Sequence, residues 1–428
     1  MSWRYETDRW RMNVWLITIG EPLPIDGEGE RLHRTGILAK TLVDRGHEVY
    51  WWSSSFDHAR LRQRPQDDLE IEVAPGYRVA LLRGRSYPRA VSIARIRNHR
   101  EVAREFKVLA ASRPKPDIIM CSFPSIELAL EASEYGRRAG IPVVIDIRDM
   151  WPDAMVFRAP RPLQGLARVA LSGMKAQARA ACAKATSITG HAPAFVEWGV
   201  RMADRPPTYL DRDFPFGYEG DPPEATALER AALFWDERGV TGRSNVCFIG
   251  SLGHTERIST VIKAARSLAS GFPGKFVICG TGDALERLRK ETVGDSGILF
   301  AGRIGRPEIW TLMRRSTAGL ACVKGSPDFL ATIQNKVPEY LSAGLPIATN
   351  LQTGTLVDLI EERGIGFTYG DDPAKLAGWL RDLVANPAAQ RSMSERALAL
   401  YHERFVATEV YASLANYLEN LARDTRRG

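Results

Sequence analysis

The chain has 428 residues, of which 44% are hydrophobic and 25% charged, and its formal net charge is +7. This length exceeds one ordinary hydrophobic core, and the composition is that of a globular protein, which excludes a disordered or fibrous chain. No apolar run reaches the ~18 residues of a membrane span, and the N-terminus lacks the features of a signal peptide. We therefore expect a cytoplasmic protein.

Apolar runs typical of buried strands alternate with helical patterns in two series. In chain order, the strands predicted for the first series are residues 14–19, 48–52, 117–123, 142–147 and 185–189. Those predicted for the second are residues 246–250, 276–280, 298–301, 318–323 and 346–349. This alternation predicts an α/β protein with two Rossmann-like, doubly wound sheets, whose ligand-binding strand ends face each other across a cleft.

The order of the elements predicts four segments. Residues 1–200 form the first Rossmann-like domain, and residues 225–386 form the second. Between them, residues 201–224 are rich in Pro, Asp and Gly and have no sustained period, which indicates a linker or hinge. Residues 387–428 are helical, and we expect them to pack back toward the N-terminal domain.

Cysteine and histidine placement gives no sign of a metal centre. The five cysteines are scattered, and four lie in strand-like apolar runs, which predicts reduced core residues. The seven histidines form no cluster with ligand spacing. We therefore expect no metal and no bound cofactor.

The first predicted strand runs into a loop that contains Gly27 and Gly29, and a helix is predicted over residues 31–45. A dinucleotide site would place Gly-x-Gly-x-x-Gly here, with an acidic residue after the next strand. The third glycine position holds Leu32, and the next strand ends in Trp-Trp-Ser, which disfavours a hydride-transfer enzyme. The two glycines can approach an anion or a sugar; a plain turn is the alternative.

The stretch "PVVIDIRDMWPDAM" ends a buried strand with Asp146, Arg148 and Asp149. Strand alternation places Asp146 and Arg148 on one face and Asp149 near the exit. Charged groups that end an apolar strand need a partner or a ligand. We predict that this strand end contacts a ligand; an internal ion pair between Arg148 and Asp153 is the alternative.

Three strand ends of the second series carry glycine turns of the kind that approach anions. These turns are Gly250-Ser251-Leu252-Gly253, Gly280-Thr281-Gly282 and Gly302-Arg303. Each is a weak signal by itself. Arg303 could border a base, and an ordinary surface arginine is the alternative.

The stretch "TIQNKVPEYLSAGLPIAT" begins a helix with Lys336 and Glu339 in one turn. Asn335 is a candidate N-cap, and Pro338 is tolerated in the first turn because it lacks only an N–H that would be unpaired there. The ammonium group suits a diphosphate and the carboxylate suits a pair of ribose hydroxyls. A local Lys336–Glu339 ion pair on a solvated helix is the alternative, and the apolar sequence around it disfavours that.

Two basic segments stand out. Residues 83–115 hold ten Lys or Arg and two Glu, and residues 158–184 hold six Lys or Arg and no acid. Such segments attract phosphates or an anionic membrane surface; a solvated helix face is the alternative. The lipid contacts predicted for the first segment are Arg85, Arg89, Arg95, Arg97 and Arg100, with Ile93 and Ile96 between head groups. No recognised nucleic-acid module is present, so we do not expect nucleic acid as a partner.

These motifs occur in the order and spacing of one family. "FIGSLGHTERISTVIKAARSL", "FVICGTGDALERLRK", "ILFAGRIGRPEIWTLMRRSTAGLACV" and "NKVPEYLSAGLPIATN" resemble the donor domain of glycosyltransferase family 4, a group of GT-B fold enzymes. "RTGILAKTLVDRGHEV" and "IPVVIDIRDMWPD" are similar to its bacterial surface-polysaccharide branch. The resemblance covers nearly the whole chain. It implies sugar transfer from a nucleoside-diphosphate sugar, with retained anomeric configuration and no bound metal.

The resemblance also implies residue roles, with the acceptor bound by residues 1–200 and the donor by residues 225–386. Glu339 would hold the ribose, Asp149 would face the sugar, and Lys336 completes the catalytic set. The implied donor-binding set is Gly250, Ser251, Gly253, Arg257, Gly280, Gly282, Arg303, Ile304, Asp328, Asn335, Lys336 and Glu339. The implied acceptor and sugar set is Gly27, Gly29, Arg148 and Asp149.

Three positions depart from the family pattern. Ser251 and Glu256 stand where the family often has Arg and Lys, and Ala331 stands where many members have Glu. We expect Lys336 and Arg257 to supply the missing positive charge and Asp328 to replace the missing carboxylate in part.

Residues and resemblance together predict a retaining glycosyltransferase that acts on a lipid-linked saccharide acceptor in surface-polysaccharide synthesis, at the inner face of the cell membrane. Closure about residues 201–224 would exclude water. The leaving phosphate can accept the proton of the acceptor, so a histidine base is not required. Two alternatives stay open: a sugar-nucleotide epimerase of the same build, and a non-catalytic nucleotide-sugar-binding protein.

Overall fold

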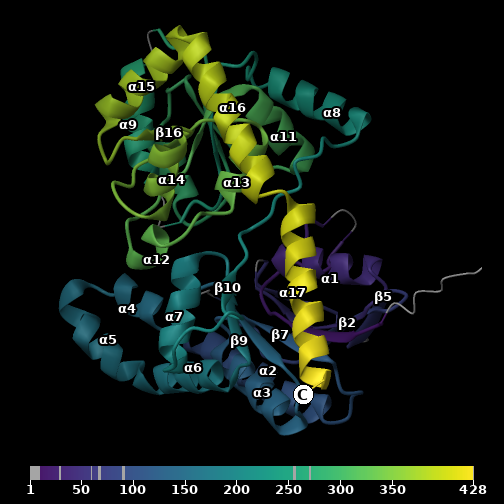
Figure 1. Ribbon diagram of the computed structural model, residues 1–428. Coiled ribbons are helices and arrows are strands. Elements are labelled where there is room, and N and C mark those ends of the chain that lie inside the picture. Colours follow the sequence, from purple (N-terminus) through teal and green to yellow (C-terminus); the bar gives the residue numbers. More distant parts are fainter. Residues whose placement is uncertain are drawn as a thin grey trace, which may run out of the picture. The chain divides into compact units, whose positions relative to one another are not determined.

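The computed structural model describes residues 10–27, 30–58, 60–65, 69–88, 92–253, 257–268 and 271–427 (Figure 1). The chain divides into two compact units. Unit 1 contains the chain up to Pro215 and again from Thr408, and unit 2 contains Phe216–Ala407. Each unit has its own sheet and its own buried apolar side chains.

The sheet of unit 1 has the strand order β10-β9-β8-β7-β1-β2-β6-β5, and all neighbours are parallel except β5 and β6. Its strands are β1 (Asn13–Ile17), β2 (Glu48–Ser54), β5 (Glu70–Ala74), β6 (Tyr77–Leu82), β7 (Ile118–Phe123), β8 (Val143–Ile147), β9 (Ser187–Gly190) and β10 (Arg212–Asp213). A separate two-stranded piece pairs β3 (Phe56–Asp57) with β4 (Arg62–Gln63). The central strands are buried throughout, as expected for a parallel sheet covered on both faces.

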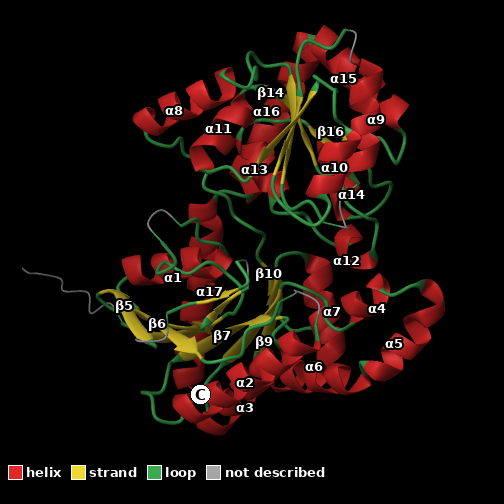
Figure 2. Cartoon of the chain, turned by 180° about the vertical axis from the view of Figure 1, so that it is seen from behind, coloured by secondary structure: helices red, strands yellow, loops and turns green. Residues whose placement is uncertain are grey.

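Helices accompany this sheet, and the last of them comes from the C-terminus of the chain (Figures 1 and 2). The helices of unit 1 are α1 (Arg34–Asp44), α2 (Ile93–Ala110), α3 (Ile126–Ala139), α4 (Asp153–Arg158), the 3₁₀ turn Arg161–Leu163, α5 (Gln164–Ala170), α6 (Ser172–Lys184), α7 (Pro193–Ala203) and α17 (Ala407–Arg427). Tyr417 of α17 hydrogen-bonds Ser187 and the carbonyl of Leu210, and Glu419 contacts Arg45 and His47. The final helix is therefore an integral part of unit 1.

The sheet of unit 2 is entirely parallel, with the order β13-β12-β11-β14-β15-β16. Its strands are β11 (Asn245–Ile249), β12 (Phe276–Cys279), β13 (Ile298–Gly302), β14 (Ser316–Leu320), β15 (Ile347–Thr349) and β16 (Gly366–Thr368). Numbered within the unit, this is the 3-2-1-4-5-6 order of a Rossmann sheet, and its order reverses between β11 and β14.

Two apolar clusters cover the two faces of this second sheet. Along β11, Val246 and Phe248 belong to one cluster, and Cys247 and Ile249 to the other, as strand alternation requires. The helices of the unit are α8 (Ala225–Asp236), α9 (Ile258–Leu268), α10 (Leu285–Glu291), α11 (Arg306–Arg314), α12 (Pro327–Leu330), α13 (Lys336–Ser342), α14 (Thr355–Arg363), α15 (Pro373–Ala385) and α16 (Pro387–Arg404). Helices α9 and α15 pack on the first face, and α8, α11, α13, α14 and α16 pack on the second.

The prediction of an α/β protein with two Rossmann-like sheets is confirmed, and every predicted strand is present within a few residues. The sequence did not indicate the β5–β6 hairpin, the short edge strand β16 or the two-residue strand β10. Strand β5 is only half-buried and begins with alternating Glu residues, which weakens the apolar pattern. The described units divide at Pro215 and Ala407, inside the predicted linker and inside the predicted C-terminal helical segment.

Candidate functional site

The ends of β11 and β14 mark the point in unit 2 where the strand order reverses. Open parallel sheets bind ligands outside the carboxyl ends of their strands at such a point. Helix α13, which carries Lys336 and Glu339, is anchored there by Tyr340. The hydroxyl of Tyr340 accepts a hydrogen bond from the amide of Ile249 at 2.9 Å and donates one to the carbonyl of Leu320 at 3.3 Å. One buried side chain thus ties the helix to both strand ends.

Lys336 is the first residue of α13, and its ammonium group lies at the end of β11. Its Nζ is 4.1 Å from the centroid of the Phe248 ring, a cation–π contact. A Cβ built on Gly250 would lie 3.0 Å from the same Nζ. The cation is therefore held next to the glycine turn that follows β11.

The glycine turns that follow β11 and β12 contact each other through their backbones beside this site. Gly250, Gly280 and Gly282 have φ values of +156°, +140° and +154°, which favour glycine. The amide of Gly250 donates to Cys279, and a Cβ on Gly280 would overlap the carbonyl oxygen of Gly250. These turns approach each other so closely that no side chain fits between them. The fold itself therefore requires glycine at these positions, whether or not a ligand binds.

Glu339 lies one turn after Lys336 and is buried, with 4% of its surface exposed. The predicted alternative for this stretch was a solvated helix surface, and burial of the carboxylate excludes it. Asn335 occupies the N-cap position of α13 and is exposed, and its side chain makes no capping hydrogen bond. The helix start predicted at Asn335 is therefore in place without the side-chain cap.

The remaining predicted donor residues are at strand ends or in adjoining loops. Asp328 of α12 is buried and accepts a hydrogen bond from Ser326 at 2.5 Å. Arg257 and Arg303 are exposed, and Ile304 packs partly against the core. Ser251 is exposed and Gly253 is half-buried after β11, whereas Glu256 lies outside the described residues. The geometry brings Lys336 together with Gly250 and, through Gly250, with Gly280.

In unit 1, the charged end of β8 forms an internal network. Asp146 is fully buried and accepts hydrogen bonds from Arg34 at 3.0 and 3.1 Å and from Thr189 at 3.0 Å. Arg148 donates to Asp146 at 2.7 Å and is also paired with Glu21. Buried charges need such pairing.

The pairing of Arg148 differs from the internal Arg148–Asp153 ion pair that the sequence left as the alternative. Its guanidinium contacts Asp146, Glu21 and the hydroxyl of Thr35, so it joins β8 to the N-terminal turn of α1. The alternative partner, Asp153, instead accepts hydrogen bonds from Trp198 at 3.0 Å and Lys175 at 3.1 Å. Sequence spacing could not show this, because Glu21 and Thr35 come from another part of the chain.

Asp149 is half-buried at the exit of β8. Burial lowers the pKa of Arg95 on α2, and the negative charge of Asp149 acts against this shift. Asp149 therefore lies near the guanidinium of Arg95 on α2. Gly27 has a φ of +153° and an open surrounding, and Gly29 lies outside the described residues.

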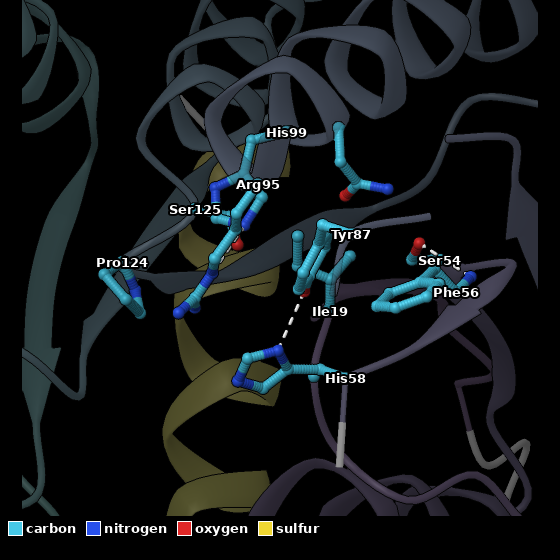
Figure 3. Close-up of a pocket in the computed structure, with 11 residues that line it drawn as sticks. Ile19, Ser54, Phe56, His58, Tyr87, Arg95, His99, Pro124 and Ser125 are labelled. Carbon is cyan, nitrogen blue, oxygen red and sulfur yellow. Dashed lines mark hydrogen bonds between the residues drawn. The ribbon is translucent and has the colours of Figure 1, made fainter. Parts of the chain in front are cut away.

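A pocket opens beside Arg95, at the carboxyl ends of β1, β2 and β7 (Figure 3). Its empty volume is about 320 Å³, part of it open to solvent. It is lined by Ile19, Gly20, Ser54, Phe56, His58, Tyr87, Arg95, Asn98, His99, Pro124 and Ser125. The histidines form no cluster along the sequence, because His58 and His99 come from distant segments that only the fold brings together.

The described part of the chain contains neither a metal-ligand cluster nor a helix suited to span a membrane. There, no three side chains of His, Cys, Asp or Glu come close enough to hold a metal ion. Within the same residues, no helix combines the length and the apolar character needed to cross a membrane. All five cysteine side chains are buried, in agreement with their prediction as core residues.

Known proteins with similar features support the same conclusion about fold. Residues 243–386 match a family model described as "Glycosyl transferases group 1". A search of curated proteins found no match. These matched residues comprise most of unit 2, including the strand ends and α13.

Solved structures resemble the whole chain at low sequence identity. The sucrose-phosphate synthase of Thermosynechococcus elongatus has a TM-score of 0.71 at 16% identity, over 96% of this chain and 99% of that chain. HepE of Anabaena, in complex with UDP, has a TM-score of 0.63 at 13% identity, over 96% and 100%. A Listeria monocytogenes protein proposed to be a UDP-N-acetylglucosamine 2-epimerase has a TM-score of 0.57 at 12% identity, over 95% of both chains. The chain therefore has the GT-B fold, and its unit 2 carries the sequence signature of the group 1 glycosyl transferases.

Proposed function

We propose that the protein is a retaining glycosyltransferase that transfers a sugar from a nucleoside-diphosphate sugar to a lipid-linked saccharide in surface-polysaccharide synthesis. The observation that carries the proposal is the position of Lys336, whose ammonium group lies beside Gly250 where the Rossmann sheet of unit 2 reverses. The family match of residues 243–386 supports sugar transfer. The UDP complex of HepE, which has the same fold, supports a nucleotide donor.

In this proposal the donor is held by unit 2. Lys336 neutralises the diphosphate and stabilises the charge that develops on the leaving group. The glycine turn after β11 lets backbone amides approach the same phosphates. Glu339 accepts hydrogen bonds from the ribose hydroxyls, and Arg303 borders the base. Because α13 has only seven residues, the ammonium group contributes more here than the dipole of the helix.

Bond making follows from these contacts. The acceptor hydroxyl attacks the anomeric carbon on the face that the leaving diphosphate occupies, and a phosphate oxygen takes the hydroxyl proton. The anomeric configuration is retained, and no metal and no histidine base takes part. Asp149 is proposed to position the sugar or to stabilise positive charge at the anomeric carbon.

The test uses full-length protein with a panel of UDP-, ADP-, GDP- and dTDP-sugars, with and without a bacterial lipid extract. We expect release of one nucleoside diphosphate and transfer of its sugar to the lipid fraction, with the anomeric configuration determined by NMR. A rearranged sugar that stays attached to the nucleotide would establish the epimerase instead, which the fold shared with the Listeria protein makes the second candidate. Saturable binding without either product would establish a non-catalytic binding protein.

We further propose that unit 1 contacts an anionic membrane, and the surface at α5 supports this better than α2. Leu163, Leu166 and Val169 are 52%, 69% and 71% exposed. Arg161 and Arg168 lie among them, and residues 158–184 contain no acid. Apolar side chains flanked by cations are typical of interfacial membrane contacts.

Three of the basic residues predicted to contact lipid in the first segment have other partners or positions. Arg85 is paired with Glu101, Arg100 lies 3.7 Å from Glu127, and Arg95 lines the pocket. Ile93 is 71% exposed, Ile96 is half-buried, and Arg89 lies outside the described residues. These pairs lower the net positive charge that α2 presents.

Vesicle co-sedimentation distinguishes the two surfaces. With vesicles containing phosphatidylglycerol, the double variant Leu166→Ser/Val169→Ser should bind at least about fivefold more weakly, since each exposed apolar side chain contributes roughly 1–2 kcal/mol on insertion. Leu233→Ser, at an exposed leucine of unit 2, is the matched control. Equal binding to purely zwitterionic vesicles would contradict the proposal.

A further inference from the structure

The pocket of unit 1 lies at the point where the first sheet reverses its strand order. Strands β1 and β7 are neighbours, and the chain continues from β1 to β2 on one side and from β7 to β8 on the other. Ile19 and Gly20 follow β1, and Pro124 and Ser125 follow β7. The pocket is therefore in the position where a parallel sheet binds a small ligand.

The polar groups of the pocket are cationic or neutral. Among the described residues that line it there is one guanidinium, two imidazoles, a phenol, an amide and two serine hydroxyls, and none carries a carboxylate. Asp57 and Asp149 lie nearby and act on His58 and Arg95 electrostatically, but neither lines the pocket. A cavity with this set of groups favours an anion over a neutral sugar.

The guanidinium of Arg95 is fixed in place before any ligand arrives. Its Nε donates to Nε2 of His99 at 3.3 Å, and its carbon lies 4.6 Å from the centroid of the Trp151 ring. In Figure 3 the group extends between Pro124 and His58. Because Nε is engaged by His99, the guanidinium is held at a fixed position in the lining of the pocket.

A second donor faces Arg95 from another element. Nδ1 of His58 is 2.8 Å from the hydroxyl of Tyr87, which orients the ring. Burial first, and then the charge of Arg95, lower the pKa of His58 to about 4. The ring is therefore neutral at pH 7, and a bound anion would offset both causes and favour its protonation.

We propose that this pocket binds a phosphate group, and that the glycosyl acceptor carries this phosphate. Donors on several sides, from α2 and from the segment after β3, suit a tetrahedral oxyanion better than a planar carboxylate. The assignment to the acceptor rests on the proposed glycosyl transfer, whereas phosphate binding by the pocket does not.

The first experiment measures binding of inorganic phosphate to the full-length protein by calorimetry, with saturating UDP present to occupy unit 2. We expect saturable binding that tightens between pH 8 and pH 6, since His58 takes up a proton with the anion. The charged and titratable groups near His58 are Asp57, Tyr87, Arg95, His99 and, through Arg95, Asp149. Absence of saturable binding would overturn the proposal, while UDP binding itself reports separately on the proposed function.

Variants locate the site. Arg95→Gln should weaken phosphate binding at least tenfold, and His58→Gln should remove most of its pH dependence. Arg97→Gln, at an exposed arginine two residues along the same helix, should change affinity less than twofold. Because Arg95 packs on Trp151, Arg95→Lys tests the same point with the charge kept and should bind more tightly than Arg95→Gln. Wild-type affinity in Arg95→Gln would overturn the proposal.

The two sources of phosphate are separated by competition. A hexose 6-phosphate and a polyprenyl monophosphate in detergent are each titrated against bound inorganic phosphate, with the hexose and the polyprenol as controls. Competition by only one of the phosphates identifies the source. Equal competition by phosphate-free controls would contradict recognition of the anion.

Discussion

At the scale of single residues, the proposed donor site of unit 2 depends on one ammonium group. Lys336 is held between the Phe248 ring and Gly250, so its charge is fixed at one strand end. The neighbouring positions Ser251 and Ala331 supply no charge, so in the proposed site Lys336 carries a larger share of the phosphate contact.

Lys336→Ala should therefore weaken UDP binding about 10- to 100-fold, because a charge-assisted hydrogen bond contributes roughly 1.5–3 kcal/mol. Isothermal titration with UDP measures this. Lys263→Met, at an exposed lysine of α9, is the control and should bind as the wild type does. An affinity of Lys336→Ala within twofold of wild type would remove the residue from the site.

Two buried histidines make unit 1 sensitive to acid. Burial, followed by nearby arginine charges, lowers the pKa values of His99 and His191 to about 3. In the unfolded chain the value is about 6.5, so below that pH the unfolded state binds protons that the folded state does not. The free energy of unfolding should fall as the pH drops from about 6.5 toward 4, by up to about 1.4 kcal/mol per pH unit for each histidine.

Urea denaturation at several pH values checks this. His99→Gln should reduce the slope of stability against pH, whereas His402→Gln, at an exposed histidine of α16, should leave it unchanged. The same slope in His99→Gln and wild type would show that His99 is not the group responsible.

At the scale of elements, α13 is positioned by packing more than by its own sequence. Its seven residues are too few to form a stable isolated helix. Tyr340 compensates by bonding both Ile249 and Leu320, and Gly319 leaves room for its ring. The sequence predicted where this helix begins, but the bonds that hold it depend on two strands that lie far away in the chain.

Tyr340→Phe should lower the free energy of unfolding of unit 2 by about 1–3 kcal/mol, since a buried amide and a buried carbonyl lose their partner. UDP binding should weaken as well, because α13 carries Lys336. Chemical denaturation and calorimetry measure the two effects. Tyr209→Phe, at a tyrosine that is 83% exposed, provides the control, and equal stability of the two variants would contradict the anchoring role.

At the scale of the whole molecule, the chain passes from unit 1 to unit 2 at Pro215 and returns at Ala407. The last helix completes the first unit. Its buried apolar residues are Val410, Tyr411, Leu414, Ala415, Tyr417, Leu418, Leu421 and Ala422.

A chain that stops after Ala407 should therefore lose the fold of unit 1 and keep that of unit 2. Each large buried side chain contributes roughly 1.5–3 kcal/mol, and together they match the ~5–15 kcal/mol that stabilises a whole domain. Limited proteolysis with mass spectrometry would show cleavage throughout residues 10–215 and protection of residues 216–407. A chain that stops after Arg423, within the exposed end of α17, is the control, and protection of unit 1 in the shorter chain would refute the prediction.

The sequence by itself determined the local features: the strand runs, the glycine turns, and the placement of Lys336 and Glu339 in one helical turn. These depend on periodicity and on contacts between near neighbours, which the order of residues specifies directly. It also indicated an additional helical segment at the C-terminus, because apolar side chains there recur at helical spacing.

Only the tertiary structure decided which partners meet across the chain. It joined Arg148 to Glu21, brought His58 and Arg95 into one pocket, and divided the C-terminal helices α16 and α17 between the two units. Such contacts depend on strand order and on burial, and a buried charge takes whichever partner the fold places beside it.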